Sequence, residues 1–565
     1  MPWNVRHCAV LALSCLVVLS GSPASAQDRF SVRALREALS TGSLVAQAQT
    51  GGTQVAPAAA QTVEPVRRLT MEEAVRLALE NNLGVRLARF APQVEDLTLV
   101  SVQTAWTPTV TNTFQGSSTN TPNNTFLAGN TGNKTTNGQF LNNFGVQKQM
   151  GHGGTYKVGW DGSRLTTNNS FTTFSPQLRS SLSLDVNQPL VRGFSIDSVR
   201  QQVQASLKNR EIADVQLRET IASTMRAVRN AYWNLAYAHA SLRVQQQSLE
   251  LAQESLRNTK SRVEIGTTPP IDIVEAESEV AQREEAVIVG EAQIQTAEDQ
   301  LRALVFDPAT PDFWTMHIEA VDLPSFQPIA VDADAAVRNA LDKRTDLQQT
   351  SKSMEVTDIN IRFLRNQSLP DVTASFNYGL SGIGGTQLVR GLGPFGPGTG
   401  AVTGELQRPF TTVLGDIFQN SFPAWTAGLN ISYPIGHSQA EAELAKARLQ
   451  TAQQRAQLRN QQLQVSTQVR EAARQVVTNQ KRVGSTGAAR NLAERRLDAE
   501  QRKLAAGTST NFVVFQTQRD LAVARNNELK AILDFAQSVV DLETVQEVPL
   551  TPTAGAGAAT TTAAR

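Results

Sequence analysis

The chain has 565 residues, a formal net charge of +1 and two cysteines, Cys8 and Cys15. The balanced charge does not indicate a polyanionic partner, so we predict no nucleic-acid binding. Both cysteines fall within a predicted export signal, and we therefore expect the mature chain to lack a disulfide framework and a thiolate metal site.

Residues 1–26 have the layout of a secretory signal peptide. Arg6 precedes an apolar run at residues 8–19, which is too short to span a bilayer, and the segment ends on an A-x-A cleavage site at Ala24 and Ala26. Residues 27–68, rich in Ala, Gln, Thr and Gly, are predicted to form a flexible periplasmic arm. No later run of about 18 apolar residues follows, so we expect any membrane span to consist of β-strands.

The rest of the chain is predicted to be one unit written twice. The stretch LTMEEAVRLALENN at residues 69–82 recurs as VDADAAVRNALDKR at residues 331–344, an offset of 262. The same offset carries Pro108 onto Pro370 and Phe114 onto Phe376. The predicted division is repeat 1 at 69–305, a proline-containing linker at 306–330, repeat 2 at 331–546 and a disordered tail at 547–565.

Each copy reads as helix, strand, long loop, strand and a very long helical hairpin. Residues 195–265 contain neither glycine nor proline, and a continuous helix there would be about 100 Å long. Apolar or small residues recur in this run at spacings of three, four and seven, as in a coiled coil. In repeat 1 they include Met225, Val228, Tyr232, Leu235, Leu242 and Leu249, and in repeat 2 Leu458, Val465, Val469, Ala472, Val476 and Val483.

Four strands are predicted, at residues 107–116, 181–189, 370–379 and 426–434. Each alternates apolar or β-branched residues with polar ones and approaches the 9–11 residues that a tilted strand needs to cross a bilayer. Aromatic residues lie near the strand ends, where a membrane surface favours them: Trp106, Trp425 and Tyr433. The strand pattern alone fits a soluble sandwich equally well.

The segments between the strands, residues 117–177 and 380–422, suit the outward loops of an outer-membrane protein. Residues 146–160 indicate an extra hairpin around residues 151–154, either within the strand layer or above it. Four strands cannot close on themselves, and an open sheet edge is not tolerated in lipid. Several copies would have to share one sheet.

The duplicated openings, the proline-ended strands and two glycine-threonine turns together resemble the TolC-like outer-membrane efflux proteins over residues 69–545. The resemblance implies a mixed α/β membrane protein, in which a homotrimer builds a 12-stranded transmembrane β-barrel from four strands per chain and continues it as a long α-helical barrel. It also implies the outer membrane of a Gram-negative bacterium, with the helices in the periplasm. The implied partners are outer-membrane lipid, a periplasmic membrane-fusion adaptor and an inner-membrane pump of the RND or ABC type.

The two turns, GTTPPID at residues 266–272 and GTSTNFV at residues 507–513, each separate two predicted helices. Basic residues in the preceding turn and a glycine at its end suit a helix stop, and Thr268 is predicted to cap the next helix, as is Ser509 or Thr510. The resemblance implies that the turns are periplasmic tips that dock the adaptor. The tip residues are Gly266, Thr267, Thr268, Pro269, Pro270, Gly507, Thr508, Ser509 and Thr510. Two ordinary tight hairpins are the alternative.

Asp272 matches an aspartate that follows the first turn in the family. We predict that Asp272, with Glu275 assisting, supplies a negative field at the entrance. The second turn departs from the family's charged pattern, because Ser509, Val513 and Gln516 are uncharged. Glu277 and the acidic residues after it are predicted to form a solvated helix face.

No catalytic residue, cofactor or metal site is predicted. His152, His239, His317 and His437 are scattered, without paired spacing or cysteine partners. The predicted function is passive export of drugs, small toxic compounds or metals. The alternatives are the exit duct of a type I protein-secretion system and a periplasmic coiled-coil scaffold that is no channel, with a secreted enzyme as a distant third.

Overall fold

The computed structural model describes residues 66–123, 133–169, 171–311, 313–322, 326–393, 396–436 and 438–548. The chain divides into two units, Met1–Val63 and Glu64–Arg565, and the described residues all belong to the second. The predicted signal peptide, the arm up to residue 65, His437 and the tail beyond residue 548 lie outside the described residues.

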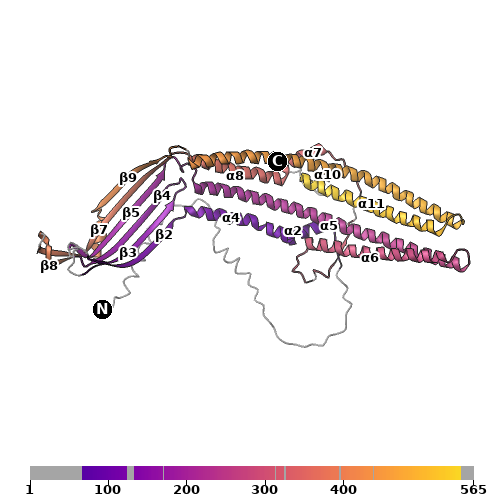
Figure 1. Cartoon of the computed structure of the whole chain (residues 1–565), viewed down its shortest axis with the longest axis horizontal. Coiled ribbons are helices and arrows are strands. Elements are labelled where there is room, and N and C mark those ends of the chain that lie inside the picture. The colour runs from indigo at the N-terminus through magenta and orange to yellow at the C-terminus, as the bar shows by residue number, and fades with distance from the viewer. Residues whose placement is uncertain are drawn as a thin grey trace, which may run out of the picture. The chain divides into compact units, whose positions relative to one another are not determined.

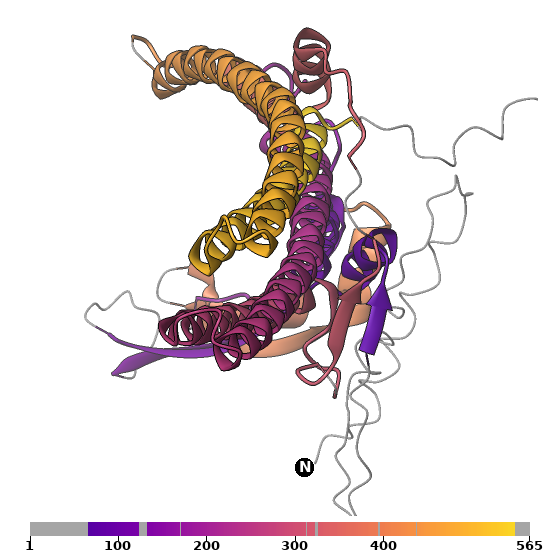
Figure 2. The ribbon, with the colours of Figure 1, turned by 90° about the vertical axis from the view of Figure 1, so that its right-hand side faces the viewer.

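Two long helical hairpins dominate the second unit (Figure 1). Helix α5 (Ser198–Glu264) pairs with α6 (Ile271–Val305), and α10 (Gln439–Ala505) pairs with α11 (Asn511–Gln546). The predicted long helix is confirmed, since α5 and α10 each run for 67 residues. The hairpins contact each other through α5 and α11 and follow curved paths when seen from their tips (Figure 2), as coiled-coil packing requires.

Shorter helices lie along the long ones between their starts and their middles. Helix α2 (Met71–Asn81) leads through α3 (Leu83–Ala88) to α4 (Phe90–Gln103), which packs on α5. Helix α7 (Ala333–Lys343) leads to α8 (Thr345–Gln367), which packs on α5 and α10. None of the helices in the described ranges combines the length and hydropathy that a bilayer crossing requires.

Helices α2 and α7 begin and end in the same way at positions 262 apart. The Thr70 side chain accepts from the backbone N–H of Glu73, and the Asp332 side chain accepts from those of Asp334 and Ala335. At the other end Asn82 and Arg344 have ψ values of 124° and 126°, so the backbone is extended where it leaves each of the two helices.

A small parallel sheet is anchored to the waist of the long helices. It pairs β1 (Val66–Leu69) with β6 (His317–Ala320). The fully buried Tyr232 of α5 donates its hydroxyl to the carbonyl of Leu69 at 3.0 Å and accepts from the backbone N–H of Asp322 at 2.9 Å. Burial raises the pKa of Tyr232 to about 12.

The main sheet has seven strands, all antiparallel to their neighbours, in the order β2-β3-β4-β5-β7-β8, with β9 also paired to β7. The strands are β2 (Thr109–Pro122), β3 (Lys134–Gln149), β4 (Thr155–Thr167), β5 (Phe174–Pro189), β7 (Asp371–Gly393), β8 (Gly396–Arg408) and β9 (Pro423–Ser432).

The sheet has seven strands where four per chain were predicted. The four predicted strands correspond to β2, β5, β7 and β9, which are the strands that continue into α4, α5, α8 and α10. The predicted extra hairpin at residues 146–160 consists of the β3–β4 turn and the adjoining ends of both strands. It lies within the sheet, between β2 and β5. The strands are longer than predicted because their alternation continues through Asn, Thr and Gly residues that indicated loop.

The strand registers separate apolar and polar residues onto opposite faces. One row across six strands is apolar or aromatic, running Val110, Val146, Val158, Leu184, Tyr378 and Trp425. The adjacent row, on the other face, is polar throughout, running Thr109, Gln147, Lys157, Asp185, Asn377 and Thr426.

Helix α9 (Phe410–Phe418) packs on the far end of the apolar face. It approaches β7 so closely that a Cβ added at Gly382 would overlap the carbonyl oxygen of Val413. Gly382 therefore makes room for the helix backbone and Gly384 for the Val413 side chain and the Arg408 carbonyl, and α9 buries Val413 and Ile417 against the sheet.

We expect Tyr232→Phe to loosen the β1–β6 sheet. The substitution leaves the part-buried Asp322 N–H without its partner, which costs about 1–3 kcal/mol, whereas the Leu69 carbonyl still accepts from the N–H of Val321. Hydrogen exchange of residues 66–72 and 317–322 should accelerate, whereas the exposed Tyr433→Phe should leave it unchanged. Unaltered exchange in Tyr232→Phe would show that the hydroxyl does not hold this sheet.

Candidate functional site

The predicted first tip joins α5 to α6 through a helix stop built on Gly266. Its φ is 81°, the left-handed region that only glycine adopts freely. The N–H of Thr267 then reaches back to the carbonyl of Arg262 at 2.9 Å, and the Thr267 hydroxyl donates to the same oxygen at 2.9 Å. This bonding satisfies a carbonyl that the helix end would otherwise leave free.

The predicted second tip repeats this geometry between α10 and α11. Gly507 has a φ of 73°, and the N–H of Thr508 donates to the carbonyl of Lys503 at 2.9 Å. The prediction that each turn begins with a left-handed glycine after a basic helix end is confirmed, with Arg262, Arg502 and Lys503 in the last turns.

The predicted caps on the following helices are not formed. Helix α6 begins at Ile271 with Pro270 at its cap position, and the buried hydroxyl of Thr268 has no partner within the described ranges. Thr510 occupies the cap position of α11 but makes no side-chain cap bond, while the Ser509 hydroxyl donates to Glu500 at 3.0 Å. The proline ring sets φ at the start of α6 without help from a threonine oxygen.

Asp272 links the two tips. It lies in the first turn of α6, where the helix dipole favours a carboxylate, and its Oδ2 accepts from the Nδ2 of Asn511 at 3.0 Å. Asn511 is the first residue of α11 and is buried. Because its amide is neutral, the hydrogen bond does not neutralise the carboxylate.

The acidic residues after Asp272 have different surroundings. Glu275 is exposed, and Glu277 is exposed and pairs with Lys260 of α5 at 2.9 Å. Glu279, by contrast, is only 2% exposed and lies between Arg283 at 2.7 Å and Arg519 of α11 at 2.9 Å. The prediction of a solvated face from Glu277 onward is therefore wrong at Glu279, since a distant arginine covers this carboxylate.

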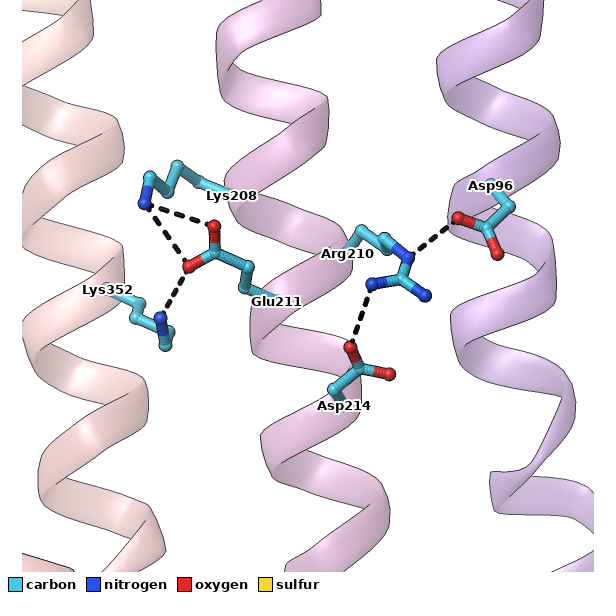
Figure 3. Close-up of polar contacts among 6 residues, drawn as sticks. All are labelled: Asp96, Lys208, Arg210, Glu211, Asp214 and Lys352. Atoms are coloured by element: carbon cyan, nitrogen blue, oxygen red, sulfur yellow. Dashed lines mark hydrogen bonds and ion pairs between the residues drawn. The ribbon is translucent and has the colours of Figure 1, made fainter. Parts of the chain in front are cut away.

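A second charged cluster lies near the start of α5 and joins three helices (Figure 3). Glu211 of α5 pairs with Lys208 on the same helix and with Lys352 of α8, while Arg210 pairs with Asp96 of α4 at 2.8 Å. The hydrogen bond from Lys352, followed by that from Lys208, lowers the pKa of the Glu211 carboxyl. The pairs point to both sides of α5 and hold it to its neighbours.

The described ranges contain no group of three or more His, Cys, Asp or Glu side chains placed to hold a metal ion. His152 lies in the β3–β4 turn, His239 within α5 and His317 at the start of β6. The structure thus leaves these three histidines in separate places and does not bring them into one site.

A family model described as outer membrane efflux protein matches residues 153–305 and 336–545. The CmeC outer membrane channel of Campylobacter jejuni superposes with a TM-score of 0.59 at 14% identity, covering 84% of this chain and 85% of that one. The outer membrane protein VceC of Vibrio cholerae gives 0.58 at 14% identity, covering 85% and 97%. The open-state MtrE outer membrane channel of Neisseria gonorrhoeae gives 0.55 at 16% identity, covering 90% and 98%. No curated protein sequence matches the chain.

We expect Gly266→Ala and Gly507→Ala each to destabilise a tip by about 1 kcal/mol or more, because alanine must adopt a left-handed conformation there. Limited proteolysis should cleave the altered turn faster. Gly484→Ala is the matched control, since Gly484 lies inside α10 with open space around its Cα, and it should be neutral or slightly stabilising. Equal proteolysis of all three variants would contradict the assigned helix stops.

The Glu211 cluster should contribute stability in a pH-dependent way. A carboxyl with a lowered folded-state pKa stabilises the fold above its ordinary value of 4.5, and this contribution is lost as the pH falls through the folded-state pKa. Glu211→Gln should cost at most about 1 kcal/mol at pH 7, since the pairs are partly exposed. In thermal unfolding the deficit should shrink below pH 4.5, and Glu219→Gln, on the exposed surface of α5, should show neither effect. A deficit independent of pH would contradict the assignment.

Proposed function

The chain belongs to the outer membrane efflux protein family, and we propose that it is a passive exit channel for drugs, small toxic compounds or metals delivered by an inner-membrane pump and a periplasmic adaptor. It performs no chemistry on its cargo. The pump, of the RND or ABC type, selects the substrate, so that a type I protein-secretion role differs from this one in the partner and not in the channel.

The apolar face of the seven-stranded sheet, which α9 covers only at its far end, is the observation that carries this proposal. Val158 is 41% exposed and Leu184 is 37% exposed, although both lie in the middle of the apolar row. Such a face is stable against lipid and unfavourable in water. Among the described strands no second sheet packs on it, as the soluble scaffold would require.

The sheet edges support assembly of several copies. The outer edge of β2 and the outer edge of β9 carry no partner strand among the described residues. In a bilayer these backbone groups need partners, and a neighbouring copy supplies them by pairing its own edge. We propose a homotrimer with its helices in the periplasm. Each of its three chains consists of two repeats of one unit.

We assign adaptor docking to the exposed helical tips. The two turns have the same bonding, so three chains would present six similar tips to an adaptor. The docking residues are Gly266, Thr267, Thr268, Pro269, Pro270, Gly507, Thr508, Ser509 and Thr510.

We assign the negative field of the entrance to Asp272, with Glu275 assisting. Asp272 accepts from the neutral amide of Asn511, and Glu275 is exposed on the same first turns of α6. Rings of carboxylates at a constriction favour cations. The uncharged Ser509 and Gln516 add nothing to this field from the second tip.

The native mass in detergent tests the assembly, with three chains expected and a soluble monomer contradicting it. In planar bilayers Asp272→Asn should reduce the preference for cations over anions by about twofold or more. Glu277→Gln is the matched control, because Lys260 already pairs with this carboxylate. If both variants keep the wild-type preference, Asp272 is not part of the entrance field.

A further inference from the structure

The β3–β4 hairpin is an integral part of the main sheet. Its first strand pairs with β2 from Thr109 to Pro122, and its second pairs with β5 from Gln177 to Asn187. A hairpin that covered the end of the sheet would leave β2 and β5 to pair with each other. Here both strands use the hairpin as their only neighbour on that side.

The face pattern of the sheet continues through the hairpin without a change of phase. Val146 and Val158 extend the apolar row from Val110 to Leu184, and Gln147 and Lys157 extend the polar row on the opposite face. A shift of one residue in either strand would exchange the two faces. The hairpin is therefore built for the same two environments as the strands on either side.

Trp160 and the basic residues on the apolar face of the hairpin are placed as lipid requires, whereas the side-chain oxygen of Asn142 on this face is buried without a partner among the described residues. The indole N–H of Trp160 donates to the hydroxyl of Ser180 at 2.8 Å, on the neighbouring strand. The basic residues of this face lie toward the strand ends, Lys148 beside the turn and Arg164 at the other end, where long side chains reach the membrane surface.

The hairpin turn lies at the end of the sheet where the helices begin. The N–H of Met150 donates to the carbonyl of Gly154 at 2.6 Å, and the carbonyl of His152 accepts from Gln188 at 3.3 Å. A Cβ at Gly153, which has a φ of 80°, would lie 2.6 Å from the carbonyl oxygen of Gly193. The five-residue turn is thus packed against the segment that leads from β5 into α5, as the short periplasmic turns of outer-membrane sheets are.

We propose that the β3–β4 hairpin spans the membrane as part of the channel wall, so that each chain contributes six strands and not four. The six are β2, β3, β4, β5, β7 and β9, because β8 pairs only with the part of β7 beyond residue 384. At 16 and 13 residues, β3 and β4 exceed the 9–11 residues that a tilted strand needs.

This inference rests on the proposed trimeric channel and specifies how wide that channel would be. Three chains of six strands would close about 18 strands, and the diameter of a closed sheet grows roughly linearly with strand number. The wall would be about half again as wide as one of 12 strands. The apolar row would face lipid acyl chains, and Lys157 would face the water-filled interior beside Asp185.

Site-directed fluorescence distinguishes the hairpin from the rest of the wall. Single cysteines at Val158, on the apolar row, and at Lys157, on the polar row, are labelled with an environment-sensitive fluorophore in a Cys8→Ser, Cys15→Ser background. The trimer is reconstituted in vesicles that contain doxyl-labelled lipid. Leu184→Cys and Asp185→Cys are the matched controls, because these residues pair directly with Val158 and Lys157 on β5.

The proposal predicts quenching at Val158→Cys within about twofold of that at Leu184→Cys, and little quenching at Lys157→Cys or Asp185→Cys. Quenching at Leu184→Cys alone would show that the hairpin is not part of the membrane wall, while the proposed channel would still stand. Absence of quenching at both apolar positions would overturn the membrane sheet itself. For the unaltered protein, electron microscopy of the trimer in lipid discs should show six wall strands per chain, and four per chain would overturn the proposal.

Discussion

The alternation of side chains along the strands is the constraint on which the rest of the structure depends. Six strands hold one phase, so that every residue of one row is apolar and every residue of the next row is polar. A sheet with this pattern and no covering layer needs lipid on one face and water on the other, with no free backbone at its edges. The long helices, which are polar over much of their surface, belong outside that layer. The membrane location of the sheet, the assembly of several copies and the position of the helices outside the bilayer thus all follow from the two-residue alternation of the strands.

The sequence was sufficient to predict the helices and four strands because their signals are local. Residues 195–265 lack any helix breaker, and α5 occupies Ser198–Glu264. The left-handed glycines of the tips were likewise predictable, since Gly266 and Gly507 follow basic helix ends. The β3–β4 hairpin was harder to predict from the sequence. In β3, KTTNGQFLNNFGVQKQ, residues of low strand propensity interrupt the alternation, and only the pairing partners on β2 and β4 show that it continues.

The site residues that sequence reasoning missed depend on contacts between distant segments. Glu279 belongs to an acidic helix and resembles its solvated neighbours, yet Arg519, 240 positions later, covers it. The partner of Asp272 is Asn511, whose position gave no signal of a link between the tips. The predicted caps failed for a local reason, since proline at the start of α6 already sets the backbone angle that a capped helix needs. Spacing along one helix cannot reveal what a second helix places opposite it.

The burial of Glu279 makes it costly to separate the two helical hairpins near their tips. Moving α6 away from α11 would strip Arg519 from the carboxylate and expose a charge that the folded packing had enclosed. The remaining pair with Arg283 lies on the same helix and does not resist this movement. Because the attraction falls away once water enters, the resistance to moving α6 from α11 is greatest at the start of the movement. The packing of α11 on α5 holds the hairpins together along the rest of their length, so this ion pair acts locally, near the tips.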